Sequence, residues 1–573
     1  MHERGIQVRI LLVAAALFFA LAGVGARLAF LHLADHSKLT GREYRRTLLG
    51  LRGRIFDCNG DRFPMALSLP ARQFYLDPKA VKKEHDPRQI AKTVAECLDL
   101  REEDVLAKFN QKDSRYIKLG VSLNDKVFEI LSDTKHISGV GSEDLVRRSY
   151  PQGRRMSHVL GFVNDMGVGG AGIEQQYNRF LTGTPGMIES ELDAGRREIW
   201  IRRKMYVPAI AGSDIYLTLD HNIQYEVELA LKEVVEKFEA SGGWAIVQRV
   251  KTGEILAMAS YPDFEPEQYT QESLDVWRNS ALAIVYEPGS IMKSVTVAAA
   301  LNERIVTPDT LIDAGEGCWM YAGKPLRDHV MGRISVSTAL KKSSNIACAK
   351  IGLMLGNKRL ETYLRAFNFG EKLGIELPGE ERGILARSKD WDRLKPARVP
   401  IGQGVAVTGL QMINAYSTLA NDGVMMKPYL VSRIVSSGGE TVFKTTPEVL
   451  GRPVRPEVAR AVREMLIGVT EEGGTGKRAS VPGYSIGGKT GTAQKAVPGG
   501  YSSTDYYASF VGFVPAREPV FSVLVSVERP RPQHTGGFVS APAFAKIAAA
   551  TARYLEVPPD LPLEEEEQAA NRP

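Results

Sequence analysis

Residues 286–301 read YEPGSIMKSVTVAAAL, and this stretch is the starting point for both the fold and the chemistry of the chain. The proline and glycine before Ser290 predict a tight turn, and the apolar run from Val295 to Leu301 predicts a helix that Ser290 opens. Side chains three residues apart share a helix face, so the Lys293 amine can reach the Ser290 hydroxyl. We interpret Ser290 as a nucleophile and Lys293 as its base, against the simpler alternative of a serine that only caps a helix.

Two more short motifs follow in chain order. Ser343-Ser-Asn345 lies between predicted helices, and Lys489-Thr-Gly491 follows two glycines that let a backbone edge approach a ligand. We expect Ser343 to carry a proton and Asn345 to orient the lysine and the substrate. Lys489 would hold a substrate carboxylate and would lower the pKa of Lys293 by like-charge repulsion.

None of these motifs is specific alone, because each occurs twice in the chain. The second copies are Ser132-Asp-Thr-Lys135, Ser122-Leu-Asn124 and Lys251-Thr-Gly253. Ser132 lies in a charged, turn-like stretch, and Lys251-Thr-Gly253 joins two predicted strands, so a loop or a turn explains them. The order of the other three motifs, together with their context, favours a joint function for that set.

Residues 483–490 also match the phosphate-loop pattern GxxxxGK[ST]. That motif needs a strand before it and a helix after it. Pro482 precedes it, and Gly491, Pro498, Gly499 and Gly500 follow, so a helix is not expected there. We therefore do not expect a nucleotide site.

The region around the motifs predicts an α/β (α+β) domain over residues 213–555. Strands come first and last, with helices between them, so an antiparallel sheet would be completed from both ends of the region. The expected strands are 215–219, 244–250, 255–260, 508–514 and 521–527. The expected helices are 222–239 with Asp220 as N-cap, 295–301, 336–340, 410–419 and 541–555.

The N-terminus predicts membrane anchorage. An apolar run over residues 10–33 is long enough for a transmembrane helix, and Arg4 and Arg9 before it place residues 1–9 in the cytoplasm. A cleavable signal peptide is the alternative, and either reading exports the rest of the chain. Residues 34–212 show no catalytic pattern and would form a spacer or docking module, and residues 556–573 would form a disordered acidic tail.

Composition excludes several other classes of protein. A formal net charge of +6 over 573 residues does not indicate nucleic-acid binding. The four cysteines stand far apart without a Cys/His cluster, so we predict neither a structural zinc nor a disulfide framework, although one or two disulfides are compatible with the sequence.

With these motifs in place, the sequence resembles the penicillin-binding protein and serine β-lactamase superfamily, which carries SxxK, SDN and KTG in this order. Ser344 stands where that family often has the central aspartate. Residues 52–60 resemble the RGxIxDRNG segment of class B penicillin-binding proteins, with Cys58 where arginine is usual. Further class B segments are Arg148–Gly153 with His158 and Gly161, Gly172–Glu174 through Tyr177 to Gly186, and Gly402–Gly404 with Val407 and Thr408.

The resemblance implies a dimerisation-type pedestal, a transpeptidase domain with a five-stranded antiparallel sheet flanked by helices, and no cofactor or metal. Ser290 would attack the D-Ala-D-Ala carbonyl of a stem peptide, with Lys293 as base and Ser343 and Asn345 assisting. Lys489, Thr490, Gly491 and Thr492 would bind the substrate, and the N–H groups of Ser290 and Thr492 would form the oxyanion hole. β-Lactams would acylate Ser290.

Glu287 before the nucleophile resembles FtsI-like division enzymes, whereas elongation-type members more often have proline there. This implies septal crosslinking of the products of lipid-linked precursors at the inner membrane, with the catalytic domain outside. Its partners would be an FtsW-like glycan polymerase and other division proteins. The alternatives are an elongation-type transpeptidase, a D,D-carboxypeptidase, a β-lactamase, and a wall-assembly scaffold or β-lactam sensor without enzyme activity.

Overall fold

The computed structural model describes residues 2–33, 42–60, 62–81, 85–111, 114–132, 137–192, 198–498 and 500–562. The chain divides into two compact units, one formed by residues 1–50 with 184–210 and the other by residues 51–183 with 211–573. The predicted disordered tail lies outside the described residues from position 563 onward. Its first part is ordered, in contrast to the prediction, because Val557 is buried and the Asp560 carboxylate accepts a hydrogen bond from Ser485 N.

The smaller unit contains one long helix and a three-stranded sheet. Helix α1 spans His2–Leu33, and its segment Leu11–Phe30 has a mean hydropathy of 2.1 and is long and apolar enough to cross a membrane. This agrees with the span predicted over residues 10–33. The antiparallel sheet has the order β1–β6–β7, with the strands Arg42–Leu48, Gly186–Leu192 and Met205–Val207, and the short 3-10 helix η2 spans Trp200–Arg202.

The larger unit contains a sheet whose strands come from distant parts of the sequence. Its order is β17–β16–β8–β2–β3–β4, and β5 pairs with β3. The bounds are Ile55–Phe56 (β2), Pro64–Leu76 (β3), Ile117–Ser122 (β4), Val140–Ser149 (β5), Asp214–Leu217 (β8), Val431–Val435 (β16) and Thr441–Lys444 (β17). We predicted a domain boundary between residues 212 and 213. Strands from both sides of that boundary share this sheet, since β8 pairs in parallel with β2.

Short helices surround the first part of this sheet. A buried apolar cluster joins β3 and β4 to α2, α3 and α4, which span Pro87–Leu98, Glu102–Phe109 and Asp125–Leu131. Three further short helices follow, namely α5 (Ser157–Leu160), α6 (Gly172–Gln176) and α7 (Asn178–Leu181).

Two arginines from the class B segments converge on one buried carboxylate. Arg52 Nε and Arg148 Nε each lie 2.6 Å from a different oxygen of Glu174, whose side chain has no exposed area. Arg148 Nη1 also donates to the Gly53 carbonyl at 2.8 Å. This triad ties β5 and α6 to the segment that leads into β2, because each ion pair crosses between these elements.

The five-stranded sheet that the resemblance implies for the second part of the chain is present and contains four of the five expected strands. The expected strand 215–219 is instead β8 of the other sheet, and the fifth strand, at residues 487–497, was not predicted as a strand. The order of the five-stranded sheet is β10–β9–β21–β20–β19, and every neighbouring pair is antiparallel. The strands are Gly242–Arg249 (β9), Ile255–Tyr261 (β10), Gly487–Val497 (β19), Gly500–Val514 (β20) and Phe521–Glu528 (β21). The sheet is thus completed from both ends of the domain, and β19 lies at its edge.

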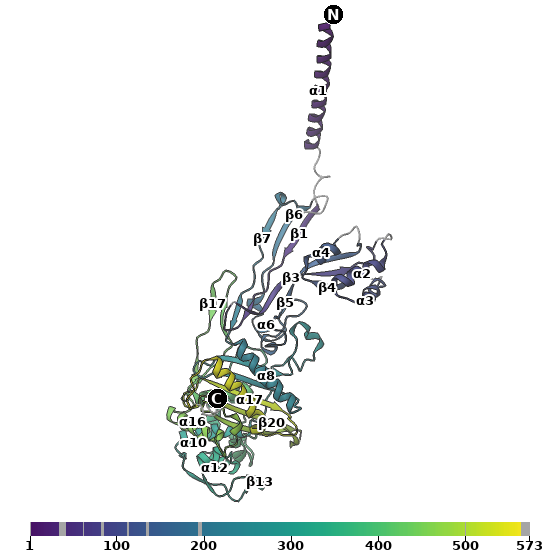
Figure 1. Cartoon of the computed structure of the whole chain (residues 1–573). Helices are drawn as coiled ribbons and strands as arrows, with labels where there is room; N and C mark the ends of the chain where they lie inside the picture. The colour runs from purple at the N-terminus through teal and green to yellow at the C-terminus, as the bar shows by residue number, and fades with distance from the viewer. Residues whose placement is uncertain are drawn as a thin grey trace, which may run out of the picture. The chain divides into compact units, whose positions relative to one another are not determined.

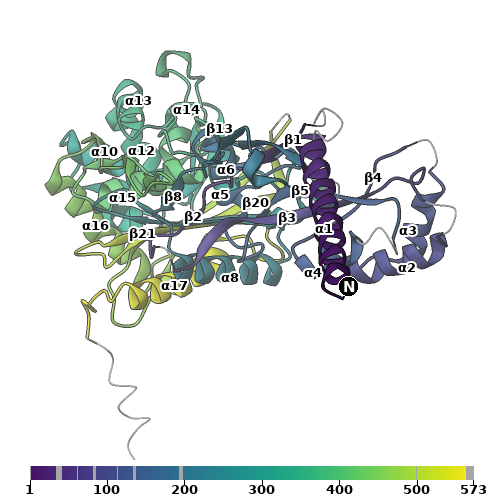
Figure 2. The ribbon, with the colours of Figure 1, turned by 90° about the horizontal axis from the view of Figure 1, so that it is seen from above.

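Helices cover both faces of this sheet (Figures 1 and 2). Helices α8 (His221–Lys237) and α17 (Gly536–Tyr554) pack on one face, while α15 (Gly409–Ala420) and α10 (Lys293–Asn302) belong to the core on the other. Asp220 caps α8 as predicted, by accepting from Asn222 N at 2.9 Å. Helix α17 begins at Gly536, five residues before the predicted position at 541, and Pro542 lies inside it.

The remaining elements of the domain form the helical region between β10 and β19. The helices are η3 (Pro266–Gln271), α9 (Ser280–Ala283), η4 (Gly289–Met292), α11 (Val336–Lys341), α12 (Asn345–Leu355), α13 (Asn357–Ala366), η5 (Ser388–Asp390), α14 (Lys395–Arg398), η6 (Val399–Ile401), α16 (Pro456–Thr470) and η7 (Lys477–Ala479). The short strands are β11 (Leu311–Asp313), β12 (Cys318–Tyr321), β13 (Lys324–Arg327), β14 (Arg333–Ser335), β15 (Met425–Met426) and β18 (Val449–Gly451).

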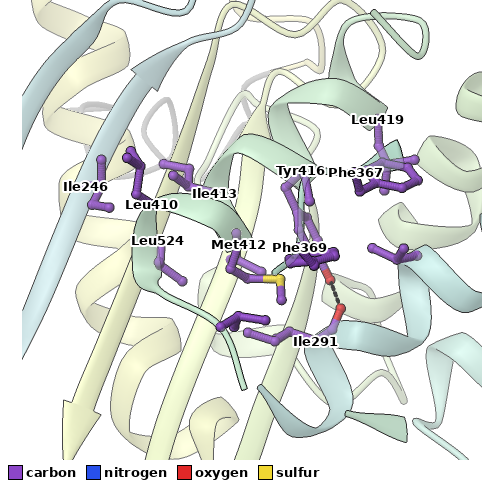
Figure 3. Close-up of a cluster of buried hydrophobic side chains, with 14 of the residues drawn as sticks. Ile246, Ile291, Phe367, Phe369, Leu410, Met412, Ile413, Tyr416, Leu419 and Leu524 are labelled. Carbon is purple, nitrogen blue, oxygen red and sulfur yellow. Dashed lines mark hydrogen bonds between the residues drawn. The ribbon is translucent and has the colours of Figure 1, made fainter. Parts of the chain in front are cut away.

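Helix α15 is the centre of the larger core, and all of its residues are buried. Its apolar side chains Leu410 and Ile413 lie toward Ile246 of β9 (Figure 3). On another side, the Tyr416 hydroxyl donates to the Ile291 carbonyl at 2.9 Å. The sheet and the turn that begins at Gly289 are therefore held by the same helix.

The buried triad gives a test of the first part of the fold. Glu174→Ala should lower the free energy of unfolding by about 3–5 kcal/mol, because it leaves two buried guanidinium groups without their carboxylate. Urea denaturation would measure the loss. Arg101→Ala is the control, since it breaks an exposed Arg101–Asp104 pair and should change stability by less than about 0.5 kcal/mol. A Glu174→Ala loss no larger than that of the control would contradict the role of the triad.

Candidate active site

Ser290 lies in the 3-10 turn η4, directly before α10. The sequence predicted a helix start at this serine, and the structure adds one 3-10 turn ahead of the α-helix. Gly289 has a φ of 55° and donates from its N–H to the Gly402 carbonyl at 3.0 Å. A Cβ on residue 402 would lie 2.1 Å from the Gly289 carbonyl oxygen, so the loop after η6 can support this turn only with glycine at that position.

Lys293 is the first residue of α10, and its side chain is completely buried. Its Nζ donates to the Ser343 carbonyl at 2.6 Å, to Asn345 Oδ1 at 2.7 Å and to Ser343 Oγ at 3.2 Å. The first and second motifs of the sequence therefore meet at this amine. Three oxygen acceptors therefore hold this amine, which belongs to the third residue after Ser290.

Ser343 lies between two lysines. Its Oγ also accepts a hydrogen bond from Lys489 Nζ at 2.9 Å, so the third motif joins the other two. The backbone at Ser343 has a φ of 58°, a left-handed conformation that is uncommon for a residue with a side chain. This conformation, at the connection between α11 and α12, turns both the carbonyl and the hydroxyl of Ser343 toward Lys293.

Strand β19 carries Lys489, Thr490, Gly491 and Thr492 at the edge of the five-stranded sheet. Lys489 is completely buried, whereas Thr492 is half-buried. Thr490 Oγ1 lies 2.9 Å from Thr475 Oγ1, and Thr492 Oγ1 accepts from Gly536 N at 3.1 Å. The strand thus presents two threonines beside the cleft, with the lysine ammonium beneath them.

Burial controls the charge of both lysines. Desolvation lowers the pKa of Lys293 to about 8, and the Cys348 thiol and the Asp328 carboxylate act in the opposite direction. The pKa of Lys489 is held well below its ordinary value, first by burial and then by the charge of Lys293. The charge of Lys293 thus lowers the pKa of Lys489, whereas burial, and not the predicted repulsion by Lys489, lowers the pKa of Lys293.

An open cleft of about 500 Å3 lies above these groups. Its lining carries three basic side chains and no carboxylate. The lining residues are Ser290, His329, Ser343, Gly474, Thr475, Lys477, Arg478, Thr490, Thr492, Thr535, Gly537 and Phe538. Because anionic groups are absent from this set, the cleft favours a ligand with a carboxylate. The short motifs gave no sign of Thr475, which lies in the connection between α16 and η7, or of residues 535–538, which form the N-cap and first turn of α17.

The second copies of the motifs lie elsewhere and have structural roles. Asn124 caps α4 by accepting from Lys126 N, and the Ser122 hydroxyl accepts from Asn124 N. Ser132 ends the same helix, and Lys135 lies outside the described residues. Lys251–Gly253 forms the turn between β9 and β10. The phosphate-loop reading is wrong, because β19 continues through its lysine and threonine where a helix would have to begin.

One group of possible metal ligands exists among the residues that the structure describes, and it lies outside the cleft. Donor atoms of Asp57, Asp220 and His221 lie within 4.8 Å of one another. These groups are satisfied by one another and by nearby donors, since His221 Nδ1 contacts Asp57 at 2.5 Å and Asn59 Nδ2 donates to both carboxylates. We interpret the group as a helix cap. The four cysteines are all unpaired.

The chain matches two family models. The penicillin binding protein transpeptidase domain matches residues 243–549, and the penicillin-binding protein dimerisation domain matches residues 47–217. The transpeptidase match contains all three motifs that meet at Ser343, and the dimerisation match contains the Arg52–Glu174–Arg148 triad. The chain therefore belongs to the penicillin-binding proteins, and the two domains together make it a class B member.

Similar proteins agree with this assignment. Stage V sporulation protein D of Bacillus subtilis is 34% identical over 87% of this chain and 77% of its own length. The peptidoglycan D,D-transpeptidase FtsI of Escherichia coli is 29% identical over 98% of this chain and 94% of its own. A crystal structure of penicillin binding protein 3 from Mycobacterium tuberculosis with aztreonam superposes with a TM-score of 0.69 at 27% identity, covering 90% of this chain and 99% of that one.

The close contact at Gly402 gives a test of how the Ser290 turn is held. Gly402→Ala adds a clash with the Gly289 carbonyl to the strain of a positive φ, so it should destabilise the protein. Gly379→Ala is the matched control, because Gly379 has a similar φ of 82° but open space around its Cβ position. Urea denaturation should show Gly402→Ala to be about 1–3 kcal/mol worse than the control. Equal losses would mean that the turn is not held by this contact.

Proposed function

We propose that this chain is a peptidoglycan D,D-transpeptidase that crosslinks stem peptides through an acyl-enzyme on Ser290. A serine-type transpeptidase is the activity of the family to which the chain belongs. The observation that carries the assignment of residues is the convergence of Lys293 and Lys489 on Ser343 Oγ, beneath a cleft that Ser290 lines.

In the first half of the reaction, Lys293 in its neutral form would take the proton from the Ser290 hydroxyl, directly or through Ser343. A buried amine is suited to this step, because its lowered pKa leaves part of it unprotonated near neutral pH. The Ser290 oxygen would then attack the carbonyl between the two D-alanines. Backbone N–H groups of Ser290 and Thr492 would stabilise the oxyanion as that negative charge develops.

The substrate would lie along the open edge of β19. An extended peptide can add to an edge strand by main-chain hydrogen bonds, and β19 has one edge without a partner strand in the described residues. Thr490 and Thr492 would hold the terminal carboxylate, with Lys489 supplying positive charge from below. Gly491 would allow the close approach of the peptide backbone.

Loss of the terminal D-alanine would leave the peptide esterified to Ser290. The C–N bond breaks, and the proton taken from Ser290 passes to the leaving amine. An amine of a neighbouring stem peptide would then attack the ester carbonyl and form the new peptide bond, while the C–O bond to Ser290 breaks and a proton from the attacking amine passes to the Ser290 oxygen. Asn345 would orient Lys293 through both steps. A β-lactam would acylate the same oxygen and stay attached.

We further propose a septal role at the inner membrane. Helix α1 would anchor the chain with residues 1–9 in the cytoplasm and the catalytic domain outside, as the arginines before the span suggest. Partners would include an FtsW-like glycan polymerase and other division proteins. Support for the septal role comes from Glu287, the residue that resembles FtsI-like division enzymes. Its carboxylate accepts from Gly404 N at 2.8 Å and from the Tyr501 hydroxyl at 3.1 Å, beside the nucleophile turn.

A fluorescent penicillin tests the nucleophile. The wild-type protein and the control Ser132→Ala should both be labelled covalently, whereas Ser290→Ala should not, because only Ser290 would form the ester. Gel fluorescence after denaturation would read the label. Labelling that survives Ser290→Ala would exclude this serine as the nucleophile. Complementation by Ser290→Ala in cells depleted of the enzyme would instead indicate a scaffold or a sensor, and failure to restore septation supports catalysis.

Product analysis separates a transpeptidase from a carboxypeptidase. Full-length enzyme in a membrane, supplied with nascent glycan strands, should produce crosslinked muropeptides that Ser290→Ala does not produce. Chromatography with mass spectrometry after glycan digestion distinguishes these dimers from shortened monomers. Shortened monomers as the sole products would mean that water, and not an amine, is the acceptor.

A further inference from the structure

The second motif, Ser343-Ser-Asn345, lacks the carboxylate that SDN motifs carry at the central position, yet a carboxylate lies against it. Asp328 directly follows β13, and its side chain has no exposed area. One carboxylate oxygen, Oδ2, accepts from Ser344 Oγ at 2.6 Å and from Ile346 N at 2.8 Å. The other, Oδ1, accepts from the backbone N–H groups of His329 and Val330.

These contacts attach Asp328 to the start of α12. Ser344 is the N-cap of that helix, and its Oγ accepts from Ala347 N at 3.1 Å while donating to Asp328. The next residue, Asn345, uses Oδ1 to hold Lys293 and Nδ2 to donate to the Arg327 carbonyl at 3.1 Å. The end of β13 and the residue after it therefore hydrogen-bond to two adjacent residues of the motif, Ser344 and Asn345. Asn345 also contacts Lys293.

A helix cap alone does not require this arrangement. Ser344 already supplies a capping oxygen, so the helix start would be satisfied without a second acceptor. Burying a carboxylate is costly unless hydrogen bonds and nearby charges compensate. In the described part of the chain, its one ion-pairing partner within 4.0 Å is the largely exposed ring of His329, so backbone and hydroxyl donors carry most of the compensation.

We propose that Asp328 is a positioning residue of the acyl-transfer site. Its carboxylate, bound to Ser344, holds the first turn of α12 so that Asn345 and Ser343 stay on Lys293, and it takes the place of the aspartate that SDN motifs carry internally. The proposal rests on the proposed role of Lys293 as the base. The hydrogen-bond partners of Lys293 and Lys489 are Ser343, Asn345 and Thr490. Asp328 and its partner Ser344 would therefore act on the two lysines indirectly.

The same carboxylate affects the charge of the lysine. The titratable groups that face Lys293 are Lys489 from β19, Cys348 from α12 and Asp328 from the loop after β13. Burial lowers the pKa of Lys293, and the negative charge of Asp328 opposes that shift by stabilising the ammonium form. Removing this charge should therefore lower the pKa of Lys293, so that the neutral base is present at lower pH.

The test is the pH profile of acylation. With the full-length enzyme and a chromogenic β-lactam, Asp328→Asn should slow acylation roughly 10- to 100-fold at its optimum, because Asn345 and Lys293 lose their alignment. The acid limb of the profile should also move to lower pH. Glu316→Gln is the matched control, since it removes an exposed carboxylate from the same segment and should change neither quantity.

A purely structural role makes a different prediction. If Asp328 only stabilises the fold, Asp328→Asn lowers the amount of active enzyme, and the acid limb stays where it is in the wild type. That result would overturn the proposal, as would acylation at the wild-type rate. Loss of all acylation in Ser290→Ala with an unchanged Asp328→Asn enzyme would leave the proposed function intact and refute the positioning role alone.

A charge exchange provides a second variant should Asp328→Asn fold poorly. The double variant Asp328→Ser with Ser344→Asp keeps one carboxylate and one hydroxyl in contact and restores the SDN order within the motif. It should acylate at least several-fold faster than Asp328→Ser alone. A double variant no faster than that single variant would contradict the idea that the carboxylate acts from either position.

Discussion

The site depends on one constraint: two lysine side chains, both completely buried, donate to the same serine hydroxyl. Burying one ammonium group is costly, and two beside each other cannot both keep a full charge without strong compensation. The pair therefore favours a state in which at least one of the two amines is neutral. A neutral amine within reach of a serine is what the proposed acyl transfer requires, so the burial that lowers the lysine pKa would also supply the base.

The fold explains how the constraint is met. Lys293 begins α10, Ser343 connects α11 to α12, and Lys489 lies on the edge strand β19, so the three residues come from three separate elements. The helical region that carries the first two is inserted between the strands β10 and β19 of one sheet. Helix α15 packs against that sheet and also holds the Ile291 carbonyl through Tyr416, which fixes the turn that carries Ser290 relative to the edge strand.

Much of this could be predicted from the sequence. The motif order singled out Ser290, Lys293, Ser343, Asn345 and Lys489–Thr492 as candidates. Alternation with turn residues identified four strands of the five-stranded sheet but missed β19, and it included residues 215–219, which pair in the other sheet. The 3-10 turn at Gly289 and the early start of α17 could not be predicted. Local residue propensities do not separate a 3-10 turn from the first turn of an α-helix, and they place helix ends only approximately. Asp328 was missed for a different reason: it becomes part of the site only through a contact with Ser344, sixteen residues away in the chain. Pairing of β8 with β2 was also hidden, since a strand pattern does not name its partner.

The most direct test of the account is the titration of Lys293 itself. Enzyme labelled with 13C at the lysine ε-carbons can be followed by NMR across the pH range, and the Lys293 signal is assigned by its loss in Lys293→Arg. If burial produces the base, the Lys293 resonance titrates near pH 8, well below the ordinary range of exposed lysines. If the Lys293 signal titrates above pH 10 with the surface lysines, burial does not produce the base, and the central claim is wrong.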